Sequence, residues 1–218
     1  MTALFRRFFP TSADDATRRT INGNDNVIVS DGAVLNGVVI EITGNHNRIH
    51  IGKNARLNQV KIYMRGDHHT LTIGEECQFR RGSSLWFEDR HGTLSIGEKS
   101  TFEDVHVAVT EPHSNVTVGR DCMLAYDIDI RTGDSHSILC AQSGKRINYA
   151  KDIVIGDHVW IAAHSVILKG VTLPENCVVA TGAVVAKGAD APGTILGGNP
   201  AVPIKEQVTW DRRRINDR

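Results

Sequence analysis

The chain has 218 residues, with 25 basic and 25 acidic side chains, so its formal net charge is zero. This balance gives no broad electrostatic surface for nucleic acid, and the length suits one domain of roughly 150–200 residues with short extensions. No apolar run approaches the about 18 residues of a transmembrane helix. The opening MTALFRRFFPTSADD also lacks the apolar segment of a secretory signal, and none of the four cysteines forms a CxxC motif. We therefore expect a cytoplasmic protein without a transmembrane segment.

Residues 1–22 carry no repeat and are expected to form an N-terminal extension. From residue 23 a loose repeat begins, in which an aliphatic residue and a small residue recur every 22 or 23 positions: Val29-Ser30, Ile51-Gly52, Ile73-Gly74, Ile96-Gly97 and Val118-Gly119. The polar turn-forming segments GNDN, GNHN, GDHH, RHG and PHSN recur at one place in each unit. We interpret each unit as a coil of short strands with extra residues at one corner. We expect the histidines of that corner to face solvent: His46, His68, His69, His91 and His113.

The rhythm breaks after Val118, because the next opening residue, Ile155, follows 37 positions later. The extra residues form an inserted loop, 131–152, with the sequence RTGDSHSILCAQSGKRINYAKD. A long excursion from a rigid scaffold is where function is expected.

From Ile155 the sequence runs in blocks of six: IGDHVW, IAAHSV, ILKGVT, LPENCV and VATGAV. Each block opens with an aliphatic residue and places a small or β-branched residue fifth. A helix of 3.6 residues per turn would scatter this pattern, and a β-sandwich would alternate with period two. Three short strands per coil, stacked so that hydrogen bonds run between coils, satisfy it. The prediction is an all-β, single-stranded parallel β-helix, in which Cys77, Cys122 and Cys177 at fifth places are small buried hydrophobes.

The blocks in DIVIGDHVWIAAHSVILKGV, the histidine in TGDSHSI and the closing GGNPAVPIKE together resemble the left-handed β-helix (hexapeptide-repeat) acyltransferases. The closest branch resembles the O-acetyltransferases of sugars and polysaccharides. The likeness covers residues 118–206 closely and 23–118 loosely. It implies a left-handed β-helix domain over residues 23–206, a homotrimer, and acetyl-CoA as co-substrate in a groove between neighbouring subunits, with no metal required.

Residues 207–218 are expected to form a short C-terminal tail or helix. Its Arg212-Arg213-Arg214 run favours a solvated tail, with peripheral membrane contact as the alternative. The FRRFF segment near the N-terminus carries the same alternative.

Acyl transfer to a sugar hydroxyl needs a general base and a donor to the oxyanion. His136 in GDSHS matches the family's catalytic position, and an imidazole titrates near neutral pH. The resemblance implies direct transfer without a covalent acyl-enzyme, and Cys140 is the one thiol of the loop.

The group that orients this base is left open. Three nearby carboxylates are candidates: Asp127, Asp129 and Asp134. Where relatives often have a glutamate, this chain has Lys145 and Arg146, which we interpret as partners of an acidic sugar or a CoA phosphate, or as a solvated basic pair.

The remaining site residues are implied by the resemblance. Trp160 corresponds to a tryptophan that lines the acceptor side, with packing at the trimer interface as its alternative. Ala163 and Thr181 correspond to backbone contacts of the acetyl-CoA arm, whereas Lys187 and Lys205 correspond to basic residues near its nucleotide end.

The predicted function is acetyl-CoA-dependent O-acetylation of a sugar hydroxyl, on a bacterial surface polysaccharide or its precursor. Two alternatives stay open. One is N-acetylation of an amino sugar or nucleotide-sugar. The other is a different class: a non-catalytic hexapeptide scaffold or a zinc-dependent hydratase.

Overall fold

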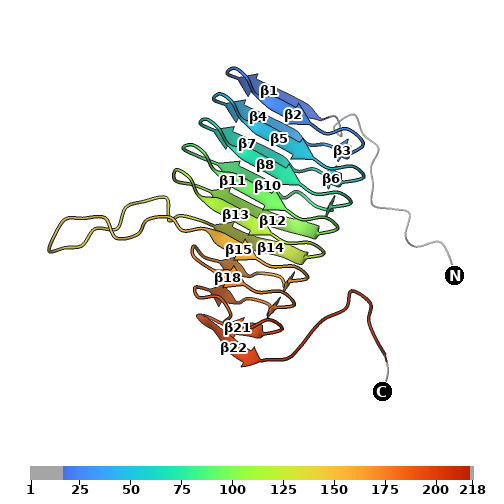
Figure 1. Ribbon diagram of the computed structural model, residues 1–218, viewed down its shortest axis with the longest axis vertical. Helices are drawn as coiled ribbons and strands as arrows, with labels where there is room; N and C mark the ends of the chain where they lie inside the picture. Colours follow the sequence, from blue (N-terminus) through green and yellow to red (C-terminus); the bar gives the residue numbers. More distant parts are fainter. Residues whose placement is uncertain (1–16, 217–218) are drawn as a thin grey trace.

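The computed structural model describes residues 17–216; the FRRFF segment, within residues 1–16, and residues 217–218 lie outside it. Within residues 17–216 the chain forms 22 β-strands and no helix, wound into a stack of three-sided coils with one long arm (Figure 1). The first strand, β1 (Arg18–Asn22), pairs in parallel with β4 (Val39–Thr43), so the stack already includes residues upstream of position 23.

The strands form three faces. Face 1 is a parallel sheet of seven strands: β2 (Val27–Val29), β5 (Arg48–Ile51), β8 (Thr70–Ile73), β11 (Thr93–Ile96), β13 (Asn115–Val118), β15 (Ile153–Ile155) and β18 (Thr172–Leu173). Face 2 carries β3 (Val34–Asn36), β6 (Arg56–Asn58), β9 (Gln78–Phe79), β16 (Trp160–Ile161), β19 (Val178–Val179) and β21 (Ile195–Gly198). Face 3 carries β1, β4, β7 (Lys61–Arg65), β10 (Ser84–Phe87), β17 (Val166–Ile167) and β20 (Val184–Val185).

Two long strands, β12 (Thr101–Val109) and β14 (Met123–Arg131), continue around the corner from face 2 to face 3. Their mutual register shifts between Asp104 and Val105, where the chain bends. At the C-terminal end, β22 (Ala201–Lys205) folds back antiparallel on β21. This hairpin covers the open end of the last coil.

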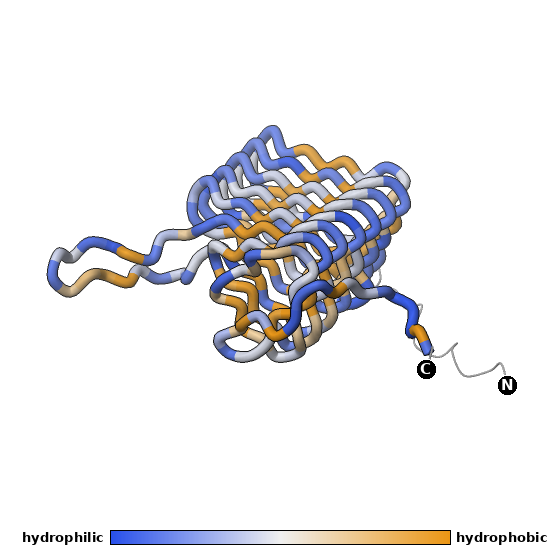
Figure 2. Tube along the Cα trace, turned by 60° about the horizontal axis from the view of Figure 1, so that its bottom comes forward, coloured by the Kyte–Doolittle hydropathy of each residue, from blue (hydrophilic) through white to orange (hydrophobic). Residues whose placement is uncertain are grey.

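The strand registers confirm both repeat lengths. On face 3, Val39 pairs with Lys61, 22 residues later. On face 2, Trp160 pairs with Val178, 18 residues later, as the six-residue blocks predict. Equivalent residues therefore stack from coil to coil, and positions of similar hydropathy recur along the stack (Figure 2).

Aliphatic ladders fill the interior. One of them runs through successive inward positions of face 3 and is fully buried: Ile40, Ile62, Leu85, Val107 and Ile130. Phe79 and Phe102 stack inside with ring centroids 4.4 Å apart. The three cysteines at fifth places are buried free thiols, which confirms their reading as small hydrophobes: Cys77, Cys122 and Cys177.

The polar corner between faces 3 and 1 carries a histidine ladder. The imidazoles of four exposed residues stack with centroids 4.7–4.8 Å apart: His46, His68, His91 and His113. Each adopts a positive φ, between 55° and 64°, in its turn. The stacking follows directly from the coil spacing, because one ring per coil repeats at the distance between adjacent strands.

His69 departs from the expectation of solvent exposure, since it is fully buried. Its Nδ1 accepts a hydrogen bond from the Gly92 amide at 3.1 Å, and its Nε2 lies 3.3 Å from the Arg65 carbonyl oxygen. It occupies the inward position that Asn47 fills one coil earlier, where a polar side chain satisfies backbone groups of the turn. Burial is the main cause that lowers the pKa of His69.

Candidate active site

The inserted segment forms a narrow arm that leaves the stack after β14 and returns at β15 (Figure 1). Its two sides hydrogen-bond to each other: the Ile147 amide donates to the Ile138 carbonyl at 2.9 Å, and the Cys140 amide donates to the Lys145 carbonyl at 2.8 Å. Four large hydrophobic residues on the arm are more than half exposed: Ile138, Leu139, Ile147 and Tyr149. The arm thus presents an exposed apolar surface that is available for contact with another protein chain.

His136 lies at the base of this arm, exposed to solvent. It lines a cleft of about 260 Å³ at the corner between faces 3 and 1. The other lining residues are Glu88, Asp89, Thr110, Glu111, Pro112, Ser135, Ser137 and Arg146. The cleft therefore joins the loop histidine to acidic and hydroxyl side chains from two coils.

Asn148 fixes the backbone beside His136, a role that the sequence pattern does not signal. This buried side chain donates from Nδ2 to the His136 carbonyl at 2.7 Å and to Asp134 Oδ2 at 2.8 Å. Its Oδ1 accepts from the Ile138 amide at 2.7 Å and from Arg146 Nε at 3.1 Å. One amide thus links both sides of the arm at its base.

The candidate carboxylates have other partners. Asp134 forms an ion pair with Lys169, and this ammonium, followed by Asn148, lowers the pKa of Asp134. Asp127 and Asp129 contact the two side chains His164 and Arg131, respectively. Among residues 17–216, no hydrogen bond involves the imidazole ring of His136, so none of these carboxylates orients it within one chain.

The two basic residues of the arm, Lys145 and Arg146, lie in different surroundings. The Arg146 guanidinium turns into the cleft and forms an ion pair with Glu111, which raises the pKa of Arg146. Lys145 lies on the exposed part of the arm. Only Arg146 therefore sits beside His136.

The other expected site residues lie away from His136. Trp160 is a half-buried outward residue of face 2, between Met123 and Val178 of the neighbouring coils. Ala163 and Thr181 occupy the corner between faces 2 and 3, where the Gly182 amide donates to the Ala163 carbonyl. Across residues 17–216, no protein acceptor takes the backbone N–H of Ala163 or Thr181.

Lys187 and Lys205 are both exposed near the C-terminal end of the stack. Lys187 Nζ lies 3.6 Å from Asp190 Oδ2, and Lys205 belongs to β22. Residues 17–216 contain no group of three or more histidine, cysteine or acidic side chains arranged to hold a metal ion.

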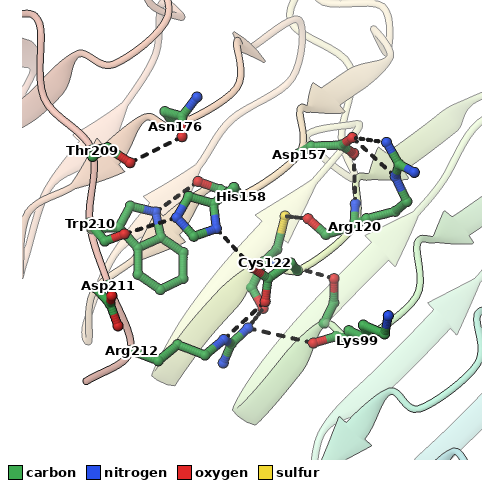
Figure 3. A network of polar contacts seen from close by, with 12 residues as sticks. Lys99, Arg120, Cys122, Asp157, His158, Asn176, Thr209, Trp210, Asp211 and Arg212 are labelled. Carbon is green, nitrogen blue, oxygen red and sulfur yellow. Dashed lines mark hydrogen bonds and ion pairs between the residues drawn. The ribbon is translucent and has the colours of Figure 1, made fainter.

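The first part of the C-terminal tail, through Arg212, binds back onto the corner between faces 1 and 2, whereas Arg213 and Arg214 are exposed, as expected of a solvated segment (Figure 3). Trp210 stacks on His158 with centroids 4.1 Å apart, and its carbonyl lies 2.9 Å from His158 Nε2. Arg212 contacts Asp121 at 3.0 Å and donates to the Cys122 carbonyl at 2.9 Å. The tail therefore runs beside the exposed edge of Trp160, with the two indoles 6.2 Å apart.

Comparison with known proteins identifies the family to which this fold belongs. The family model described as bacterial transferase hexapeptide (six repeats) matches residues 152–187. The solved structure of the polysialic acid O-acetyltransferase OatWY is 30% identical, with a TM-score of 0.85, over 93% of this chain and 94% of that one. The chain belongs to the left-handed β-helix acyltransferase family. Its coils are accordingly left-handed, an exception to the right-handed rule for parallel crossovers.

Two curated relatives of this acyltransferase chain are polysialic acid O-acetyltransferases. The one from Escherichia coli O1:K1 / APEC is 37% identical over 91 residues, and the one from Neisseria meningitidis is 32% identical over 91 residues. These matches cover 41% and 42% of this chain, but only 29% and 42% of the relatives' own lengths. As for membranes, residues 17–216 offer no helix long and apolar enough to cross one.

Proposed function

We propose that this acyltransferase is an acetyl-CoA-dependent O-acetyltransferase that modifies a sugar hydroxyl of a polysaccharide. The observation that carries the proposal is the position of His136. Its exposed imidazole lies in a polar cleft, and its backbone is held by Asn148. The likeness to polysialic acid O-acetyltransferases supports a polysaccharide acceptor.

In the proposed mechanism, neutral His136 accepts the proton of the attacking hydroxyl, which requires a separation of about 2.6–3.2 Å. The hydroxyl oxygen adds to the thioester carbonyl, and a backbone N–H stabilises the resulting oxyanion. Collapse expels the CoA thiolate, which takes the proton from the imidazolium. Ala163 suits the oxyanion role because its N–H has no acceptor within residues 17–216.

The pantetheine chain of acetyl-CoA would then follow the corner that contains Ala163 and Thr181, with Lys187 and Lys205 near the nucleotide phosphates. This support is positional: both backbone donors lie at equivalent places on adjacent coils, and both lysines are exposed. Trp160 would contact the acceptor or the pantetheine from face 2.

A homotrimer would complete this site. Within one chain, His136 lies at the corner between faces 3 and 1, whereas Ala163 lies at the corner between faces 2 and 3. A second copy can place its own corner opposite His136, and the exposed apolar arm offers the contact surface.

The decisive experiment is CoA-thiol release with acetyl-CoA over a panel of neutral, acidic and amino sugars and their oligomers. We expect turnover with hydroxyl acceptors, and a loss of about 10²–10⁴-fold in His136→Ala with acetyl-CoA binding retained. His50→Ala, an exposed histidine of face 1, is the matched control. Near-normal turnover in His136→Ala, or transfer only to amino sugars, would refute the proposal.

The trimer is tested by mixing inactive variants. Subunits carrying His136→Ala and subunits carrying Trp160→Ala are each expected to be impaired. If one site combines residues of two subunits, co-refolded mixtures regain part of the turnover. Mixtures that stay as inactive as their components, or a monomer by light scattering, would contradict the shared site.

A further inference from the structure

Face 3 contains a slot next to the His136 cleft. Tyr63, Trp86, Ala108 and Arg131 occupy the same outward position on four successive coils. Because Ala108 is small, a gap remains between the indole on one side and the guanidinium on the other. Two strand spacings separate these walls, roughly 9.5 Å.

This slot has a volume of about 270 Å³. Its lining is Trp86, Glu88, His106, Ala108, Thr110, Arg131, Gly133 and Ser135. Complete small-molecule sites usually measure about 300–1,000 Å³, so the slot suits one unit of a longer ligand.

One wall of the slot is aromatic. Trp86 is half-buried and faces outward from β10, and the Tyr63 ring lies beside it with centroids 5.2 Å apart. The Arg65 guanidinium lies over the indole, 4.7 Å from its centroid. An outward indole supported by neighbours offers a rigid apolar plane, on which the C–H face of a sugar ring can pack at little entropic cost.

The charges around the slot favour an acidic sugar. Arg65 does not line the slot but lies over its aromatic wall, and none of the ion pairs of residues 17–216 includes it, so its guanidinium can pair with a carboxylate of a ligand that extends from the slot across Trp86. Arg131 is shared with Asp129, and His106 adds a further nitrogen. Glu88 is the one acidic lining residue, and its carboxylate can accept hydrogen bonds from sugar hydroxyls.

The slot is continuous with the candidate active site, because Glu88, Thr110 and Ser135 line both. We infer that the slot between Trp86 and Arg131 binds one unit of a carboxylate-bearing polysaccharide while a nearby unit of the same chain is presented to His136. This inference rests on the proposed function and adds a subsite to it. It makes the enzyme prefer oligomers to single sugars.

The first test measures binding without acetyl-CoA, on the full chain. Isothermal titration is carried out with oligosialic acid as the carboxylate-bearing probe and with a maltooligosaccharide of equal length as the neutral probe. We expect the acidic oligomer to bind and Trp86→Ala to weaken its affinity about tenfold, the value of one lost stacking contact. Melting temperatures verify that each variant is folded.

A charge-matched pair isolates the role of Arg65. Arg65→Gln is expected to weaken binding several-fold and to reduce its salt dependence. Arg48→Gln removes an exposed arginine from face 1 and is expected to bind like the wild type. Equal effects of the two substitutions would overturn the assignment, because general charge would then explain the binding.

Kinetics separate this subsite from the catalytic machinery. Trp86→Ala is expected to raise KM for the oligomer about tenfold with little change in KM for a single sugar unit. Wild-type oligomer binding by Trp86→Ala, equal binding of the neutral oligomer, or no binding of either probe would overturn the inference. Trp86-dependent binding without any acetyl transfer would instead refute the proposed function and leave the subsite in place.

Discussion

Replacing Asn148 with alanine should lower turnover while leaving the catalytic imidazole in place. The substitution removes four hydrogen bonds, two of which hold the backbone of residues 136 and 138. Each hydrogen bond contributes about 0.5–1.5 kcal/mol net, and more when its partner is charged. The ordered base of the arm therefore loses roughly 2–6 kcal/mol.

Only the fraction of molecules with His136 in position can react, and about 1.4 kcal/mol changes that fraction tenfold once it is small. The remaining contacts of the arm offset part of the lost free energy, so we expect kcat to fall about 10- to 100-fold. That is less than the loss predicted for His136→Ala. Binding of acetyl-CoA should be unchanged, because the Asn148 side chain makes no hydrogen bond to the residues proposed to hold this co-substrate.

The assay combines thiol-release kinetics with amide hydrogen exchange, in which the Ile138 amide should exchange faster in the variant. Asn148→Asp keeps the acceptor but loses both donors, so it should also be impaired. Gln142→Ala, an exposed change on the arm, is the control. A kcat for Asn148→Ala within twofold of the wild type, or an equal loss of acetyl-CoA affinity, would refute the positioning role.

Three further predictions concern other parts of the molecule. Burial lowers the pKa of His69, and partial desolvation and neighbouring imidazoles lower that of His91. The unfolded chain then binds protons more readily than the folded one, so the melting temperature should fall as the pH drops below about 6.5, and His69→Asn should flatten this slope. Ser143 lowers the pKa of Cys140, whereas burial raises the pKa of Cys122 to about 11. Iodoacetamide should therefore alkylate Cys140 before Cys122, which mass spectrometry of peptides measures. If transfer is direct, Cys140→Ala should keep full turnover. Trp210→Ala should make the tail sensitive to trypsin without changing the melting of the coils, and unchanged protection would contradict its docking at the corner between faces 1 and 2.

The coil architecture could be predicted from the sequence because its determinants are local. One aliphatic residue in each block of six must face inward, as Ile155 and Ile161 do, and the fifth place beside the corner must be small, as at Cys177. The extra polar residues of the N-terminal coils likewise had to collect at one corner. The same periodicity identified the inserted arm, because the arm interrupts it.

The candidate site depends on contacts between residues that the sequence repeat does not relate to each other. Asn148 meets His136 across the arm, and the tail residue Trp210 meets His158 at a separation of 52 residues. The directions of these side chains depend on how the arm and the tail fold back onto the stack. No sequence pattern distinguishes these residues from others of the same type.

The sequence by itself determined the left-handed coil stack, its buried ladders and the segment that carries His136, since short-range patterning and family motifs specify them. Only the tertiary structure decided that His69 is buried, that Trp160 lies on face 2 while His136 lies at the corner between faces 3 and 1, and that Trp86 and Arg131 face each other across Ala108. The physical reason is stacking: residues 22 or 23 positions apart become neighbours between coils, so the chemistry of a surface is set by which side chains share a column.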